Sequence, residues 1–345
     1  MQKLIHPNLL KQGDTVATVS LSWGGAGDAD LIWRYQQGVR RLQEVFGLHV
    51  VEMKHTLDGT DSLYRNPKDR ADDLTNAFSD PSVKAIFSCI GGEDSIRMLP
   101  FIDYDVIRNN PKIFLGYSDS TVTHFICMKA GVGSFYGPSI LAEFAENVEM
   151  HEYTRDSVYK SLFATDPPGV VEPSELWTGE YLPWEESKKH VQRVMKTNLG
   201  AKCISGTGTV EGHLIGGCMD VMEMIKNTEI WPDDSVWDGA ILFFETSEEM
   251  PLPARLRYWL RNYAASGILH RVSGLLWGKP YQLKYYDEYR QEILKVLAEY
   301  DLANLPVLYG LDFGHTSPMF TISYGAWAKI VCEENRLEIL SCGVK

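Results

Sequence analysis

The sequence predicts an α/β protein: a first unit built on a doubly wound parallel sheet, followed by an α+β unit. From residue 15 to about residue 141, short apolar runs alternate with segments of helical periodicity. This βαβα order is typical of a parallel sheet covered by helices on both faces. Prolines and glutamates interrupt the pattern between about 167 and 200, and strands and helices then resume. The length of 345 residues suits about two domains.

In the first unit, residues 16–19 are expected to form a strand, and the next apolar positions are three or four residues apart. That spacing predicts an amphipathic helix. The stripe consists of Ile32, Tyr35, Val39, Leu42 and Phe46. A strand at 49–51, a helix at about 69–78, and short, fully apolar strands at 85–90 and 113–115 follow in order.

The second unit is expected to begin near Lys202, after a linker or a loop over a site. Its predicted strands span 208–215 and 240–244, and its predicted helices span 219–226, 254–265 and 287–300.

Composition and charge exclude several classes of protein. The 33 Lys and Arg residues against 46 Asp and Glu residues give a net charge of −13, which repels nucleic acid and anionic lipid. No apolar stretch is long enough for a membrane helix. The six cysteines form no C-x-x-C pair, so reduced thiols are expected and a zinc site is not. The segment Met1–Pro7 does not resemble a signal peptide, which favours a cytoplasmic protein.

The most informative short motif is Gly116-Tyr117-Ser118-Asp119-Ser120, between an apolar strand and a helix. A serine at such a turn projects its hydroxyl above the sheet edge, beside the N–H groups of the helix, which suits a nucleophile. The motif departs from G-x-S-x-G because Ser120 stands at the second glycine. On this segment alone, a helix cap by Ser118 or Asp119 is the simpler interpretation.

A nucleophilic serine needs a base and a carboxylate that orients the base. Glu245 ends the apolar run 240–244, where its side chain emerges at the strand end; an exposed loop carboxylate is the alternative. His315 lies in a glycine-bearing turn after the apolar residues 307–309, and an ordinary loop histidine is the alternative.

The oxyanion of an acyl-transfer intermediate also needs N–H donors. Gly91 and Gly92 follow the strand 85–90 directly, and the N–H of Asp119 follows Ser118. A tight turn or a phosphate-binding turn is the alternative for the two glycines. A second glycine-rich turn, 24–30, has Asp30 where a dinucleotide fingerprint needs its third glycine, so no NAD site is expected.

Motifs in order along nearly the whole chain resemble the LD-carboxypeptidase family of serine peptidases. They are Gly91-Gly92-Glu93-Asp94-Ser95, Gly116-Tyr117-Ser118-Asp119-Ser120-Thr121, Tyr136-Gly137-Pro138, Gly212-His213-Leu214-Ile215-Gly216-Gly217-Cys218, Glu245-Thr246-Ser247-Glu248 and Gly314-His315. The Glu245–Glu248 segment and the tryptophan-bearing insertion before Gly200 are similar to the microcin C self-immunity branch rather than to the murein-recycling branch.

The resemblance implies a Ser-Glu-His triad of Ser118, Glu245 and His315, with an oxyanion hole from the N–H groups of Gly92 and Asp119. It implies no metal and no cofactor.

The resemblance also implies a Rossmann-like N-terminal domain (1–165), a linker or substrate loop (166–200) and a C-terminal domain (201–345) built around a small β-barrel. A homodimer is expected.

Substrate contacts are expected from Gly91 and, through the similarity of the insertion to a nucleobase-contacting loop, from Trp184, Glu185 and Glu186. Trp177 is instead expected to dock on the neighbouring domain.

The predicted function is hydrolysis of the amide between an aminoacyl or peptidyl group and a modified nucleotide. One alternative is removal of the terminal D-amino acid from a murein tetrapeptide. Another, from a different class, is a non-catalytic protein that binds a small ligand.

Overall fold

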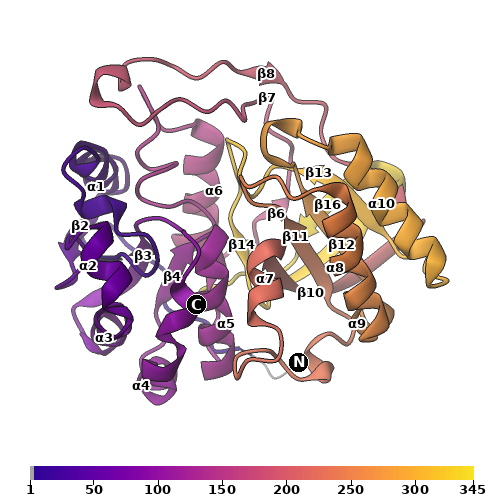
Figure 1. Ribbon diagram of the computed structural model, residues 1–345, viewed down its shortest axis with the longest axis horizontal. Helices are drawn as coiled ribbons and strands as arrows, with labels where there is room; N and C mark the ends of the chain where they lie inside the picture. Colours follow the sequence, from indigo (N-terminus) through magenta and orange to yellow (C-terminus); the bar gives the residue numbers. More distant parts are fainter. Residues whose placement is uncertain (1–3) are drawn as a thin grey trace.

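The computed structural model describes residues 4–345, which form two large sheets side by side, each covered by helices, and one small two-stranded sheet (Figure 1). Met1–Lys3, the first residues of the segment in which no signal peptide is expected, lie outside the described residues. Within residues 4–345, no helix combines the length and the apolar character needed to cross a membrane.

The first sheet has the strand order β14-β5-β4-β3-β1-β2, and all neighbouring pairs from β2 to β5 are parallel. Its strands are β1 (Thr15–Val19), β2 (His49–Glu52), β3 (Val83–Ser88), β4 (Ile113–Gly116), β5 (Phe135–Tyr136) and β14 (Ile322–Ser323). This order is that of a doubly wound α/β sheet, and its direction reverses between β1 and β3, where such folds bind ligands. The Rossmann-like prediction is confirmed.

Helices cover both faces of this sheet. They are α1 (Ile32–Phe46), α2 (Thr60–Arg65), α3 (Pro67–Ser79), α4 (Tyr104–Asn109), α5 (Thr121–Ala130) and α6 (Glu152–Leu162). Side chains of α1 and α6 pack in one apolar cluster with Val16 and Phe87, whereas side chains of α3, α4 and α5 pack in another with Ala17 and Ile86. Since neighbouring strand residues point to opposite faces, each strand feeds both clusters.

The second sheet has the order β6-β16-β15-β10-β11-β12-β13-β9. Its strands are β6 (Gly169–Val170), β9 (Lys202–Ser205), β10 (Thr209–Cys218), β11 (Ile241–Glu245), β12 (Gly274–Gly278), β13 (Val307–Leu311), β15 (Trp327–Val331) and β16 (Arg336–Ile339). Its helices are α7 (Met219–Ile225), α8 (Pro253–Ala265), α9 (Ile268–Arg271) and α10 (Tyr286–Glu299). Strands β10 to β13 are parallel, so their carboxyl ends share one edge.

The prediction of a small β-barrel in the C-terminal unit is wrong, because this sheet is open. β6 pairs with β16 alone and β9 with β13 alone, which leaves two unpaired edges. The long strand β10 pairs with β15 through Thr209–His213 and with β11 through Leu214–Cys218. β10 therefore connects the antiparallel part of the sheet to the parallel part, and the sheet does not close.

One apolar cluster joins the two sheets. It includes Tyr136 of the first sheet and Phe243 of the second, whose rings lie 5.6 Å apart. Tyr324, just after β14, has its ring 5.3 Å from that of Phe243. Because this shared core is buried and aromatic, packing fixes the relative position of the two sheet edges.

A strap of residues 167–200 crosses above both halves, with its paired strands β7 (Leu176–Trp177) and β8 (Lys196–Thr197) at the top of Figure 1.

Candidate active site

Ser118 stands at the sharp turn between β4 and α5, at the start of a short 3-10 segment, Ser118–Ser120. Its φ is +60°, a value that a residue with a Cβ rarely adopts and that is typical of a strained nucleophile turn. The residue is 8% exposed, and its backbone N–H donates to the Tyr136 hydroxyl oxygen at 3.1 Å. The turn thus fixes the hydroxyl rather than leaving it as a simple cap.

The structure brings Ser118, His315 and Glu245 together in a hydrogen-bonded chain. His315 Nε2 lies 3.0 Å from Ser118 Oγ, and His315 Nδ1 lies 2.7 Å from Glu245 Oε2. Ser118 follows β4, Glu245 ends β11 and His315 follows β13, so the three side chains meet where the carboxyl ends of both sheets face each other. This geometry allows the imidazole to take the serine proton while the carboxylate holds the ring.

Close packing around Glu245 requires glycine nearby. A Cβ on Gly314, whose φ is +93°, would lie 2.6 Å from Glu245 Oε2. The carboxylate itself is fully buried, and its other oxygen, Oε1, accepts a hydrogen bond from the Tyr136 hydroxyl at 2.5 Å. Tyr136 therefore joins the backbone of Ser118 to Glu245.

Tyr136 and Glu248 are the two site residues that sequence reasoning missed. Both stand in motifs named in the sequence analysis, but nothing in the sequence showed that the Tyr136 hydroxyl would reach Glu245. Glu248 Oε2 lies 2.8 Å from His315 Nε2, on the same ring nitrogen that faces Ser118. Its neighbour Glu249 has the same side chain, so only the loop conformation distinguishes the two.

Electrostatics in the site favour a charged imidazole. Burial alone would lower the pKa of His315, but the carboxylates of Glu245 and Glu248 outweigh it and raise that pKa well above 6.5. Reciprocally, the charge of His315 lowers the pKa of Glu248 to about 2. The ring of Tyr117 packs against the imidazole of His315, with the two ring centroids 5.1 Å apart.

The loop after β3 lies against the nucleophile, as expected. A Cβ on Gly91 would be 2.9 Å from Ser118 Cβ, and one on Gly92, whose φ is +144°, would be 2.3 Å from Ser22 Oγ. Glycine is therefore needed at both positions. Among the described residues, neither the N–H of Gly92 nor that of Asp119 has a hydrogen-bond acceptor, so both remain available to a ligand oxygen.

The buried side chain of Asp119 braces this loop. Its Oδ2 accepts from Ser22 Oγ at 2.6 Å and from the Ser95 N–H at 2.9 Å. Burial raises the pKa of this carboxyl group. One aspartate thus joins the loops that follow β1, β3 and β4.

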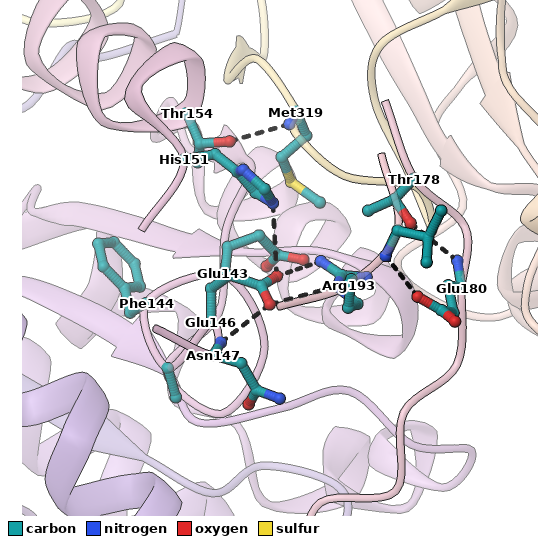
Figure 2. A network of polar contacts seen from close by, with 12 residues as sticks. Glu143, Phe144, Glu146, Asn147, His151, Thr154, Thr178, Glu180, Arg193 and Met319 are labelled. Carbon is teal, nitrogen blue, oxygen red and sulfur yellow. Dashed lines mark hydrogen bonds and ion pairs between the residues drawn. The ribbon is translucent and has the colours of Figure 1, made fainter. Parts of the chain in front are cut away.

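The strap is attached to the first half through Arg193 and Asn147. Arg193 pairs with Glu146 (Figure 2), and Asn147 Nδ2 donates to the carbonyls of Lys188 and Val191 at 3.1 and 3.0 Å. Burial would raise the pKa of Glu146, but its contacts with His151 and Arg193 lower it to about 2.

The strap is attached to the second half beside His315. Thr178 and Ser317 exchange two backbone hydrogen bonds of 2.6 and 2.9 Å. Asp312 accepts from the Ser174 N–H and from Asn198 Nδ2, both at 3.0 Å. Trp177 is 4% exposed, and Lys196 of the strap lies 5.5 Å from its ring centroid.

The candidate substrate residues of the strap separate into two groups. Trp184 stacks on Trp23 with ring centroids 6.3 Å apart, and the Arg34 guanidinium lies 4.5 Å from its centroid. The N–H of Trp23 donates to the Gly91 carbonyl, so Trp184 is one residue removed from the loop at Ser118. Glu185 and Glu186 are instead exposed and pair with Lys188 and Lys189 of the strap itself.

Comparisons with known proteins agree with this architecture. Residues 16–137 match the LD-carboxypeptidase N-terminal domain, and residues 211–330 match the LD-carboxypeptidase C-terminal domain. The microcin C7 self-immunity protein MccF of Escherichia coli is 32% identical over 97% of this chain and 96% of its own length.

Two solved structures have nearly the same fold. MccF in complex with glutamyl sulfamoyl guanosine superposes with a TM-score of 0.86 at 28% identity, covering 99% of each chain. An MccF-like protein from Streptococcus pneumoniae in complex with AMP superposes with a TM-score of 0.85 at 31% identity, covering 95% of this chain and 98% of that one. The chain therefore belongs to the LD-carboxypeptidase family of serine peptidases.

Proposed function

We propose that this protein hydrolyses the amide between an aminoacyl or peptidyl group and a modified nucleotide, as in self-immunity to microcin C-type compounds. The hydrogen-bonded chain from Ser118 through His315 to Glu245 carries the hydrolytic part of the proposal. The nucleotide part is supported by similarity to proteins solved with glutamyl sulfamoyl guanosine and with AMP.

In the proposed reaction, Ser118 Oγ attacks the scissile carbonyl carbon while His315 Nε2 takes the serine proton. The carbonyl oxygen becomes an oxyanion that the N–H groups of Gly92 and Asp119 stabilise. The C–N bond then breaks, the leaving nitrogen receives the proton from Nε2, and an acyl-enzyme remains. Water, deprotonated by His315, hydrolyses the ester and restores Ser118. Glu245 stabilises the imidazolium in both halves of the cycle.

Trp184 supports the choice of a nucleotide. Trp23 and Arg34 hold this indole ring next to the loop at Ser118, and the ring is only half-buried, so its accessible part could contact a base. Gly91 is proposed to admit the scissile group, while Glu185 and Glu186 are proposed to meet the exposed side of the ligand.

A murein tetrapeptide is the second candidate substrate, supported by the family to which both matched domains belong. Incubation of the purified protein with glutamyl sulfamoyl adenosine and, separately, with a murein tetrapeptide distinguishes the two. Mass spectrometry should show free glutamate and sulfamoyl adenosine in the first reaction and no loss of D-alanine in the second. Ser118→Ala is the control in both. Cleavage of the tetrapeptide alone would contradict the nucleotide proposal.

We further propose a cytoplasmic homodimer with domains at 1–165 and 201–345 joined by the loop 166–200. Unpaired thiols support the cytoplasm, because all six cysteines are free and four of them are buried.

A further inference from the structure

Glu248 holds His315 in a state that cannot start the reaction. The imidazole faces a carboxylate on each ring nitrogen, with Glu245 at 2.7 Å from Nδ1 and Glu248 at 2.8 Å from Nε2. Two carboxylates at these distances favour the protonated ring, an imidazolium, which carries a proton on each nitrogen. An imidazolium has no lone pair with which to accept the proton of Ser118, although Ser118 Oγ is only 3.0 Å away.

The Glu248 carboxylate also occupies the position beside His315 Nε2 that the leaving group of the substrate must reach. The leaving nitrogen must reach His315 Nε2 to receive its proton, and Glu248 lies against that atom. Turnover therefore requires Glu248 to withdraw.

The side chain of Glu248 can withdraw without moving its backbone. It is 60% exposed, while the loop beneath it is pinned by Ser247, whose N–H and Oγ donate to Asp220 at 3.1 and 3.0 Å. Rotation about the side-chain bonds of Glu248 alone would free Nε2.

Within residues 4–345, His315 is the only cation paired with Glu248. Two other cations of the protein, Arg193 and Lys279, pair with Glu146 and Asp312 instead. The other groups facing the imidazole, namely Glu245, Tyr117 and Ser118, carry no positive charge. A Glu248 carboxylate that leaves His315 is therefore available to a cationic group of the substrate.

We propose that Glu248 is a specificity-determining residue that binds a free α-ammonium group of the acyl part of the substrate and, by doing so, releases His315 to act as the base. The inference rests on the proposed function and deepens it. The α-ammonium is one carbon removed from the scissile carbonyl, so a carbonyl placed at Ser118 brings the ammonium close to Glu248. N-acylated, peptidyl substrates have no charge at this position. The site therefore prefers aminoacyl to peptidyl nucleotides.

The high pKa of His315 agrees with this arrangement, because both carboxylates raise it against the effect of burial. Once the substrate holds Glu248, only Glu245 remains beside the ring. The acid limb of kcat, which reports the enzyme-substrate complex, then lies at lower pH than the acid limb of kcat/KM, which reports the free enzyme.

The test uses alanyl sulfamoyl adenosine and its N-acetyl derivative, which differ in the charge of one amine. The wild type should prefer the free amine by roughly ten- to a hundredfold in kcat/KM, the range for a hydrogen bond between charged groups. Glu248→Gln should bring this ratio close to one. Glu249→Gln is the matched control, since Glu249 neighbours Glu248 and, within residues 4–345, only its backbone N–H is hydrogen-bonded, to Ser247 Oγ. An unchanged ratio in Glu248→Gln overturns the inference.

A second measurement does not depend on turnover. In a Ser118→Ala background, NMR titration of the His315 ring should give a lower pKa when Glu248→Gln is added and the same pKa when Glu249→Gln is added. If the proposed function is wrong, the wild type will cleave neither nucleotide. The titration would still show whether Glu248 raises the pKa of His315. An identical His315 pKa in all three proteins overturns the inference.

Discussion

Replacement of Tyr136 by phenylalanine tests whether the buried hydroxyl between Ser118 and Glu245 holds the site together. The change keeps the ring, which packs 5.6 Å from that of Phe243, and removes two hydrogen bonds. One of these donates to a fully buried carboxylate and is worth about 1.5–3 kcal/mol, as hydrogen bonds to charged groups are. Glu245 Oε1 would be left without a partner.

The matched control is Tyr324→Phe, in the same core. Tyr324 is also buried and donates one hydrogen bond of 2.6 Å, but to a neutral acceptor, the Gly216 carbonyl. A neutral bond contributes about 0.5–1.5 kcal/mol. Tyr136→Phe should therefore lower the free energy of unfolding by roughly 1–2 kcal/mol more than Tyr324→Phe.

Activity separates the two variants further. Without the Tyr136 hydroxyl, the carboxylate that orients His315 is held from one side only, and the backbone of Ser118 loses its contact. If this raises the barrier by about 1.4–2.7 kcal/mol, kcat falls roughly ten- to a hundredfold. Urea unfolding and steady-state kinetics on both variants give the two readouts. Equal kcat and equal stability in the two variants would refute the reasoning.

Three further outcomes are expected. Ser118→Ala should lose several orders of magnitude in kcat, and His315→Ala in the same chain should add almost nothing, since a triad acts as one unit; additive losses in steady-state assays would show separate roles. Trp184→Ala should weaken a nucleotide substrate about ten- to a hundredfold in kcat/KM while leaving a murein peptide nearly unaffected, because stacking is worth about 1–3 kcal/mol; equal losses for both substrates would contradict the stacking role. Because the base must be neutral and its pKa is raised, kcat/KM should rise with pH through a group above 6.5; a pH profile whose limb lies at or below 6.5 would argue against it.

Much of the fold could be predicted because its signals are local. The stripe from Ile32 to Phe46 has the same bounds as α1, and the apolar run before Glu245 forms most of β11. Strand ends also pointed to the candidate triad, since Glu245 and His315 lie at the carboxyl ends of two parallel strands of one sheet and Ser118 follows β4 of the other. That these two sheet edges face each other is not encoded in any local pattern.

The errors and omissions concern contacts that no local pattern encodes. Whether the second sheet closes depends on the pairing of its edges β6 and β9, and β6 has only two residues. β14 is equally short, so periodicity could not place Ile322 in the first sheet. The contact of Glu248 with His315 depends on the hydrogen bond from Ser247 to Asp220, and these two residues are 27 positions apart in the sequence.

The late arrival of β14 affects how the protein is made. β5 is synthesised long before its antiparallel partner Ile322–Ser323, so the nascent chain carries a bare sheet edge while the second half is translated. At about 5–20 residues per second this interval lasts on the order of ten seconds or more. Since β5 is only two residues long, it offers other nascent chains little to pair with. His315 emerges just before β14, so a ribosome that stalls earlier releases a chain with a nucleophile and no base.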